Sequence, residues 1–471
     1  MIGATSVDAP GRPAHAGSRA SRRTPRWAWA LVFALAAVAI VALEHVWRGE
    51  SYWNFSEGVY LVTARAVLDG EDLYAGIAAA QPPPLFYLGA GLMAISESLL
   101  FVRGALGLST VAVGALVAVI VGRITGRPAV GVAAGLAALL TPWTVREHAT
   151  LTPDPLAAAP LLGAALLAAR PGSRAAAIGG ALAALAACLK LAFLLPLDAI
   201  AVAARRRRPF LAGALVAGAA LAVASFAAWG PPVWDNLVSA QRETGFQLGS
   251  LPGLFGQSVW NIGPLVALGA LAVLARGHAR DPALFRSLVA LLAGSLALGV
   301  TFLKGGTYLN TLAVVEPAAV ALAAVGLTWF LEDRSLLGGR RRLASVAVGA
   351  ACAVVVLQSA VLFARPEGPF GFGNPFLSRD PGHELSEDQV RLAADRAGEC
   401  PPGAPYSGSP FVAFVAGRTV PGGQPDRFIV GEAEVHADLR AQVGADGPLC
   451  PYRTLGGLPE GGSVVGRPRL K

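Results

Sequence analysis

Four consecutive arginines, Arg205–Arg208, stand directly before the apolar run 209–229 (PFLAGALVAGAALAVASFAAW), and this stretch decides the fold class. The run has no charged side chain, and as a helix it is long enough to cross a bilayer, which takes roughly 20 residues. The whole chain of 471 residues is similar, with 54% hydrophobic and 14% charged residues and a mean hydropathy of +0.55. Soluble domains carry about 25% charged residues. The composition therefore excludes an ordinary soluble enzyme, a disordered protein and a compact nucleic-acid-binding domain, and it predicts an all-α polytopic membrane protein.

Apolar runs recur up to residue 364 and predict about eleven transmembrane helices. The predicted spans are 27–47, 104–122, 128–145, 155–169, 175–189, 191–204, 209–229, 258–275, 287–303, 308–331 and 343–364. The run 83–97 is apolar as well, but as a span it would place every later arginine cluster outside. We therefore expect an interfacial or re-entrant helix there. Arg174 and Arg205 both favour the cytoplasm, so the segment between them should bend near Lys190 and cross twice.

Basic residues orient the spans, because cytoplasmic loops carry the excess of arginine and lysine. With a cytoplasmic N-terminus, the cytoplasmic segments hold 20 basic residues and the short outer segments seven. This count predicts a multi-pass plasma-membrane protein with an extracytoplasmic C-terminus. The predicted parts are a disordered basic cytoplasmic tail (1–26), a transmembrane domain (27–364, with an outer loop at 48–101) and an extracytoplasmic segment (365–471).

The C-terminal segment is more polar and predicts a small α/β unit. Ser386 and Gln389 form a capping-box pattern for a helix over about 386–397, and the run 411–415 predicts a strand. Cys400 and Cys450 lie in this segment, where a disulfide would persist, and the sequence leaves their pairing open. No Cys-x-x-Cys, His-Glu-x-x-His or clustered His/Cys pattern occurs, so no transition-metal site is predicted.

Charged side chains gather in two predicted outer loops. Glu57, in the first, fits either a helix-capping carboxylate or a functional group. The second loop brings Arg146, Glu147, His148 and Asp154 to one membrane surface. A carboxylate there suits general-base chemistry or positioning of an acceptor, although Asp154 could equally cap the next helix. Together Glu57, Asp154 and His148 could hold a divalent cation.

Two of the three lysines, Lys190 and Lys304, stand at the outer ends of predicted spans. Lysine binds phosphate as a compact point charge, and anchoring at the interface is the alternative. Asp198 and Glu316 fall inside apolar runs, where a carboxylate is costly and a functional or paired role is expected. The sequence has no P-loop, no dinucleotide fingerprint and no Asp-x-Asp motif, so it gives no sign of a cytoplasmic nucleotide as energy source.

Several motifs in a fixed order resemble GT-C-type glycosyltransferases, which include protein O-mannosyltransferases, aminoarabinose transferases of lipid A and actinobacterial relatives. The motifs are Ser56-Glu57-Gly58-Val59-Tyr60, Leu68-Asp69-Gly70, Tyr74, Pro82–Leu85, Thr152-Pro153-Asp154, Leu189-Lys190, Gly306–Asn310 and Glu316-Pro317. The stretches 401–404 and 413–418 look like the outer segment of the actinobacterial members.

The resemblance implies a GT-C fold and transfer of a sugar from a polyprenyl-phosphate donor to a glycan, lipid or protein acceptor at the outer face. It implies that a first-loop carboxylate acts as the base and that outer cations hold the lipid phosphate. We therefore expect Glu57 as the base and Asp154 as a second active-site carboxylate. The expected substrate-binding residues are Lys190, Lys304, Arg146, His148, Tyr60, Arg65 and Tyr308.

The sequence departs from the family pattern at three positions. The family usually has Asp-Glu where this chain has Ser56-Glu57, His where it has Gln81, and Gln where it has Leu191. These departures keep two alternatives open. One is a transporter or flippase of an envelope precursor, with Asp198 and Glu316 in its pathway. The other is a catalytically degenerate GT-C-like protein.

Overall fold

The structure is a computed structural model that describes most of the chain between residues 25 and 425. The described residues are 25–50, 55–147, 149–246, 248–304, 307, 309–333, 341–363, 387–398, 410–420 and 425. Several residues named in the sequence predictions lie outside this set: His148, Tyr308, Ser386, Cys400, Cys450 and nearly all of the N-terminal tail.

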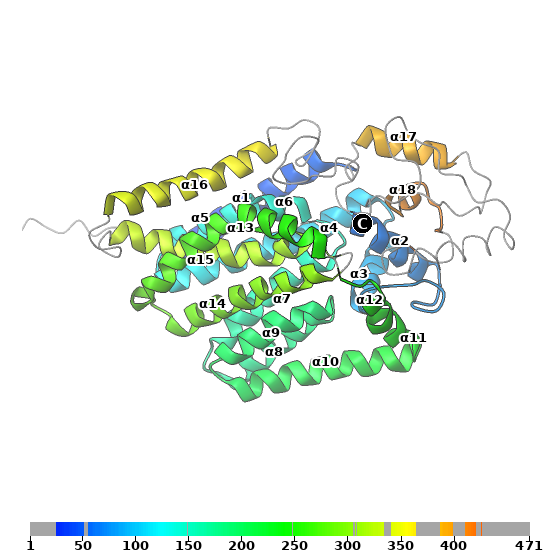
Figure 1. Ribbon diagram of the computed structural model, residues 1–471, viewed down its shortest axis with the longest axis horizontal. Helices are drawn as coiled ribbons and strands as arrows, with labels where there is room; N and C mark the ends of the chain where they lie inside the picture. The colour runs from blue at the N-terminus through cyan, green and yellow to red at the C-terminus, as the bar shows by residue number, and fades with distance from the viewer. Residues whose placement is uncertain are drawn as a thin grey trace, which may run out of the picture.

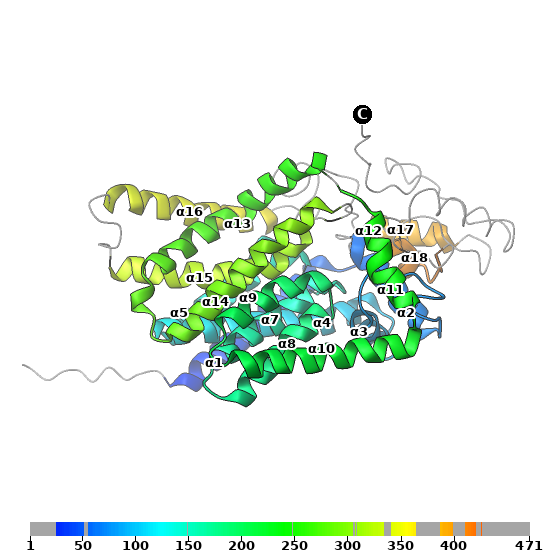
Figure 2. The ribbon, with the colours of Figure 1, turned by 60° about the horizontal axis from the view of Figure 1, so that its bottom comes forward.

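Apolar helices lie side by side along the long axis of the molecule and are joined by turns at its two ends (Figures 1 and 2). These helices are α1 (Arg26–Arg48), α4 (Leu99–Thr125), α5 (Pro128–Leu139), α7 (Pro153–Ala168), α8 (Ser173–Ala187), α9 (Leu194–Ala203), α10 (Arg207–Trp229), α13 (Leu251–Leu274), α14 (Pro282–Leu296), α15 (Leu312–Glu332) and α16 (Arg341–Phe363). Six helices are long and apolar enough to cross a membrane, and five shorter apolar helices accompany them. The prediction of an all-α polytopic membrane protein is confirmed, whereas the number of helices that cross the bilayer stays a prediction.

Burial separates central helices from peripheral ones. The apolar window of α15 is 83% buried, whereas that of α10 is only 6% buried. In a membrane protein, apolar side chains that the protein leaves exposed face lipid, since lipid tails are as apolar as leucine. Helix α15 is therefore the central helix of the bundle, and α10 is a lipid-facing helix at its edge.

Shorter helices gather at one end of the bundle, toward the right of Figure 1. They are α2 (Phe55–Leu68), α3 (Pro83–Met93), α6 (Pro142–Glu147), α11 (Pro232–Trp234), α12 (Ala240–Glu243), α17 (Glu387–Gly398) and α18 (Pro410–Val415). Helix α3 has 11 residues, and at 1.5 Å per residue it is too short to cross a hydrocarbon core of roughly 30 Å. It therefore fits the interfacial helix expected over 83–97.

The C-terminal segment differs from the prediction at residues 411–415, where the structure has helix α18 in place of a strand. A short continuous apolar run does not by itself distinguish a buried strand from a buried helix. A strand needs a neighbour with which to form a ladder, and the described residues contain only isolated bridges. A helix satisfies its own backbone, and α18 buries its apolar side chains against α2. The predicted helix over 386–397 is present as α17.

Candidate active site

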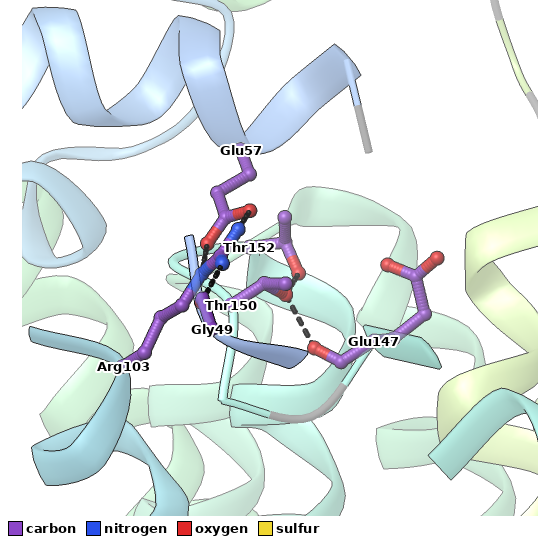
Figure 3. A network of polar contacts seen from close by, with 6 residues as sticks. All are labelled: Gly49, Glu57, Arg103, Glu147, Thr150 and Thr152. Carbon is purple, nitrogen blue, oxygen red and sulfur yellow. Dashed lines mark hydrogen bonds and ion pairs between the residues drawn. The ribbon is translucent and has the colours of Figure 1, made fainter. Parts of the chain in front are cut away.

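The end of the bundle that carries α2 and α18 also holds the carboxylates predicted for chemistry. Glu57 lies in the first turn of α2 and is fully buried. Arg103, near the start of α4, donates from Nε to Glu57 Oε1 (2.9 Å) and from Nη2 to Glu57 Oε2 (2.6 Å). Its Nη1 donates to the carbonyl of Gly49 at the end of α1 (2.8 Å), as Figure 3 shows. One buried guanidinium thus joins α1, α2 and α4.

Helix α18 packs directly on α2, and the contact requires a glycine. A Cβ on Gly58 would lie 2.4 Å from the backbone nitrogen of Phe411, closer than real Cβ contacts come. The Phe411 ring lies beneath Arg103, with its centroid 5.5 Å from Cζ. Arg65 donates from Nη1 to the carbonyl of Phe414 (2.7 Å) and stacks over that ring (4.1 Å). The C-terminal segment is therefore part of this region of the molecule.

Arg65 was predicted to bind substrate, and in the structure it ties α2 to α18. Burial lowers the pKa of Arg65, while the charges of Glu97 and Asp69 act against that change. The Glu97 carboxylate is 3.6 Å from Nη2 and mostly exposed. A guanidinium stays protonated in proteins, so Arg65 keeps its charge in this position.

A second carboxylate, Asp154, forms an ion pair with Lys190. Asp154 lies in the first turn of α7 and is fully buried. Lys190, in the turn after α8, donates from Nζ to Oδ1 (2.9 Å) and Oδ2 (3.0 Å). The lysine side chain is 17% exposed while its partner is 0% exposed. The pair therefore presents its cation toward accessible space and keeps its carboxylate inside.

The loop around α6 supplies Arg146 and Glu147, which are both buried and form an ion pair (3.1 Å). Glu316, from the central helix α15, fixes this loop: its Oε2 accepts hydrogen bonds from the backbone N–H (2.9 Å) and hydroxyl (3.4 Å) of Thr144. Thr150 then bonds to the Glu147 carbonyl and to Thr152 (2.8 Å). Figure 3 draws Glu147, Thr150 and Thr152 of the second loop together with the pair between Glu57 and Arg103.

Aromatic hydroxyls complete the first loop. Tyr60 is buried, accepts a hydrogen bond from the Gln81 side chain (3.3 Å) and packs edge-on against Phe86. Tyr74 donates to the Gln81 carbonyl (2.8 Å). Burial, with a smaller effect from Tyr87, raises the pKa of Tyr74 well above its usual range. Its hydroxyl therefore stays a donor and holds the loop.

The structure brings together only part of the predicted set. Lys304 is half-buried at the end of the 3-10 turn Ala297–Leu303 and pairs through its backbone with Phe246. His148 and Tyr308 lie outside the described residues. Within those residues no group of three or more His, Cys, Asp or Glu side chains is placed to hold a metal ion. Asp198 is exposed on α9.

Comparison with known proteins gives a fold and no family model. No family model matches, and no curated protein sequence matches. Among solved structures, ArnT from Cupriavidus metallidurans in the apo state is similar over 90% of this chain and 92% of its own, with a TM-score of 0.60 and 16% identity. The same protein bound to undecaprenyl phosphate gives 0.59 and 15% over 89% and 88% of the two chains. Both structures are of a GT-C glycosyltransferase. This chain has the GT-C fold.

A third structure agrees with this assignment at lower similarity. The Archaeoglobus fulgidus oligosaccharyltransferase, tethered to an acceptor peptide with an NVT sequon, matches with a TM-score of 0.51 and 11% identity. The match covers 85% of this chain and 64% of that one. At these sequence identities the similarity establishes the GT-C fold alone.

Arg103 is the main residue of this candidate site that sequence reasoning missed. The prediction counted it among the outer arginines and gave it no role. A signal was present, because Arg103 is a charged residue within an otherwise apolar stretch, and such residues have a partner by default. The same rule did single out Glu316, although its actual partner, Thr144 in α6, has no sequence signature.

Proposed function

We propose that the chain is an integral-membrane glycosyltransferase that uses a polyprenyl-phosphate sugar as donor and acts at the outer face of the plasma membrane. The GT-C fold supports this proposal, since ArnT with that fold has been crystallised with undecaprenyl phosphate. The acceptor would be a glycan, lipid or protein of the cell envelope. One fold hosts many functions, so the assignment of the activity depends on the residues of the site.

The observation that carries the proposal is the pair of Lys190 and Asp154. An ammonium group has three donors, and Asp154 fixes the position of Nζ from the buried side. A lysine held in this way can direct its remaining N–H donor toward an anion that approaches from the exposed side. We assign that anion as the donor phosphate, with Asp154 as the residue that positions Lys190.

Transfer of a sugar from a polyprenyl phosphate requires a base and stabilisation of the leaving phosphate. The acceptor hydroxyl gives its proton to a carboxylate while its oxygen attacks the anomeric carbon. The bond from that carbon to the phosphate oxygen breaks, and the polyprenyl phosphate leaves with the electron pair. Cations placed at the developing charge lower the barrier, because they are already oriented in a site of low dielectric. We assign this role first to Lys190, and then to Arg146 and Lys304.

Glu57 remains the proposed base. Each carboxylate oxygen has two lone pairs, and Arg103 donates one hydrogen bond to each oxygen. Because Glu57 is fully buried, an acceptor reaches it only when the residues that cover it move. Active-site hydrogen bonds often reach their working geometry only in the complex with substrate.

The test is transfer of radiolabelled sugar in membranes supplied with a panel of polyprenyl-phosphate sugars. Lys190→Ala should lower kcat/KM by about 100-fold or more, the magnitude typical of removing one preorganised electrostatic contact, and Lys190→Arg should restore part of it. Glu57→Gln should lower kcat with little change in KM. Matched controls are Arg242→Gln and Asp388→Asn, exposed residues with the same charges and no assigned role, which should keep the wild-type rate.

Two results would contradict these assignments. Transfer at the wild-type rate by Lys190→Ala would show that Lys190 does not bind the donor phosphate. The same result for Glu57→Gln would show that Glu57 is not the base. A wild-type chain that transfers no sugar from any donor would instead favour the degenerate or flippase alternative. Activity that appears only in Ser56→Asp would identify a degenerate transferase.

A further inference from the structure

Two neighbouring turns at the opposite end of the bundle carry a dense group of exposed arginines. One turn joins α7 to α8 and the other joins α9 to α10. These turns and the first residues of α8 and α10 together carry Arg170, Arg174, Arg205, Arg206, Arg207 and Arg208, all exposed. We call these six residues the arginine cluster. They lie at the end that the arginine count predicts to be cytoplasmic, away from the candidate active site.

The two turns are joined to one another by hydrogen bonds. The backbone N–H of Arg205 donates to the carbonyl of Ala168 (2.9 Å), and Nε of Arg206 donates to the carbonyl of Pro171 (3.2 Å). Beyond the turns, α8 and α10 touch through their backbones, since a Cβ on Gly180 would lie 1.9 Å from the carbonyl oxygen of Phe210. The cluster therefore has a fixed framework beneath it.

Among the described residues, the cluster has no acidic counterpart. Between Asp154 and Asp235 the sequence contains one acidic residue, Asp198. Within the part of the chain that the structure describes, neither Asp198 nor any other carboxylate forms an ion pair with the six arginines. The first turns of α8 and α10 begin beside the cluster and contain no acidic residue either. Helix N-termini carry positive partial charge, which adds to that of the side chains.

Other turns at the same end are built differently. Arg123 pairs with Asp281 (2.6 Å), and Arg127 pairs with Glu332 (2.5 Å). The arginines at the end of α4 and just before α5 therefore pair with carboxylates from neighbouring elements, and the arginines of the cluster do not. An excess of basic residues is enough to orient the chain, but it does not explain why Arg123 and Arg127 are paired with carboxylates while the six arginines of the cluster are not.

Apolar surface continues directly from the cluster. Helix α10 starts at Arg207 and exposes Leu211, Leu215 and Val216 within its first turns. A ligand that places an anion on the arginines and hydrocarbon along α10 would satisfy both surfaces. Free phosphate or a soluble polyanion would leave the apolar surface unused. A phospholipid of the inner leaflet has both parts in this arrangement.

We propose that the arginine cluster and the start of α10 form a binding site for an anionic phospholipid of the cytoplasmic leaflet. Its phosphate lies on the arginines, and its acyl chains run along α10. A lipid held there bridges α8 and α10 at their shared end and so stabilises this edge of the bundle. The proposal is independent of the glycosyltransferase assignment, because it involves neither the carboxylates of the candidate active site nor catalysis.

The test uses the full-length chain in detergent, with native mass spectrometry to count bound lipid and a thermal-unfolding assay to follow stability. Phosphatidylglycerol should remain bound and raise Tm, whereas phosphatidylcholine should do neither. Each arginine near an anionic headgroup contributes about 1 kcal/mol. The variant R170Q/R174Q/R205Q should therefore bind phosphatidylglycerol about 100-fold more weakly, and R170K/R174K/R205K should bind nearly as wild type.

The matched control is R276Q/R280Q/R286Q, which removes the same charge from exposed arginines at the same end. It should keep lipid binding within a few-fold of wild type. Equal losses in the two glutamine variants would overturn the proposal, since general charge attraction would then suffice. Stabilisation by inorganic phosphate alone would overturn it in favour of a free-anion site. If the cluster variant does not fold, wild-type binding must still weaken as salt concentration rises, and binding indifferent to salt would contradict the assignment.

Discussion

Two arginine–carboxylate pairs at opposite ends of this bundle have nearly the same length and different surroundings. Arg103 and Glu57 are 2.6 Å apart, with side chains 1% and 0% exposed. Arg127 and Glu332 are 2.5 Å apart, with side chains 54% and 35% exposed. The first pair joins three helices at the candidate active site, and the second joins the turn before α5 to the end of α15 at the other end.

The difference in burial changes what each pair does for the protein. Taking two charges out of water costs several kcal/mol per ion, and their mutual attraction repays this only when the geometry and the remaining hydrogen bonds are good. Arg103 meets that condition, because it donates to both carboxylate oxygens and to Gly49. A buried pair of this kind specifies one arrangement of α1, α2 and α4. The exposed pair is screened by water and specifies much less.

The largest expected effect comes from removing one partner of the buried pair. Arg103→Met would leave the Glu57 carboxylate buried without its guanidinium and the Gly49 carbonyl without its donor. We expect a loss of about 3–5 kcal/mol in unfolding free energy, the range for breaking a buried ion pair. Thermal or denaturant unfolding of the detergent-solubilised chain measures it.

The double variant Glu57→Leu with Arg103→Met separates lost attraction from stranded charge. Removing both charges should recover much of the stability that Arg103→Met loses, since well-packed apolar replacements of buried pairs are often neutral. If the double variant were as unstable as the single one, the cost would come from packing around α2 and not from Glu57. The difference in stability effect between the buried and the exposed pair would then come from side-chain packing and not from charge.

A smaller effect is expected at the glycine beside this pair. A Cβ on Gly58 meets backbone atoms of Phe411, which move less readily than the end of a flexible side chain. Gly58→Ala should therefore displace α18 and cost about 1–3 kcal/mol, as overpacking of a tight contact does. Hydrogen exchange at α18 and the shift in Tm report it.

Gly91→Ala is the control for that substitution. Gly91 lies in helix α3, and a Cβ there meets nothing within 4 Å. Alanine in an exposed helix position is favoured over glycine by about 1 kcal/mol, so this variant should be neutral or slightly more stable. A neutral Gly58→Ala beside it would show that α18 does not depend on close contact with α2.

Sequence alone predicted the bundle because its signals are local. Length and apolar composition define the helices, and the placement of arginines even separates α8 from α9 near Lys190. The orientation of the helices in the membrane stays a prediction. The strand predicted at 411–415 failed for the opposite reason. Its conformation depends on what covers it, and the partner, α2, is far away in sequence.

The candidate site was predictable in its residue types but not in its pairings. The motifs singled out Glu57, Asp154 and Lys190, and the structure places the last two within hydrogen-bonding distance. No sequence signal joined Glu57 to Arg103. A pair between distant residues is decided by which helix faces meet, and an apolar helix with a weak preference among its faces does not encode this locally.

The smallest expected effect tests the exposed pair. Arg127→Gln removes a contact as short as that of Arg103, so an argument from distance alone would predict a similar loss. Exposed ion pairs contribute about 0–1 kcal/mol, because the ions are already solvated and holding long side chains costs entropy. We therefore expect a change of about 0.5 kcal/mol or less, which shrinks further in high salt. A loss comparable to that of Arg103→Met would show that burial does not set the difference between the two ends, and that the end of α15 is as sharply specified as the start of α2.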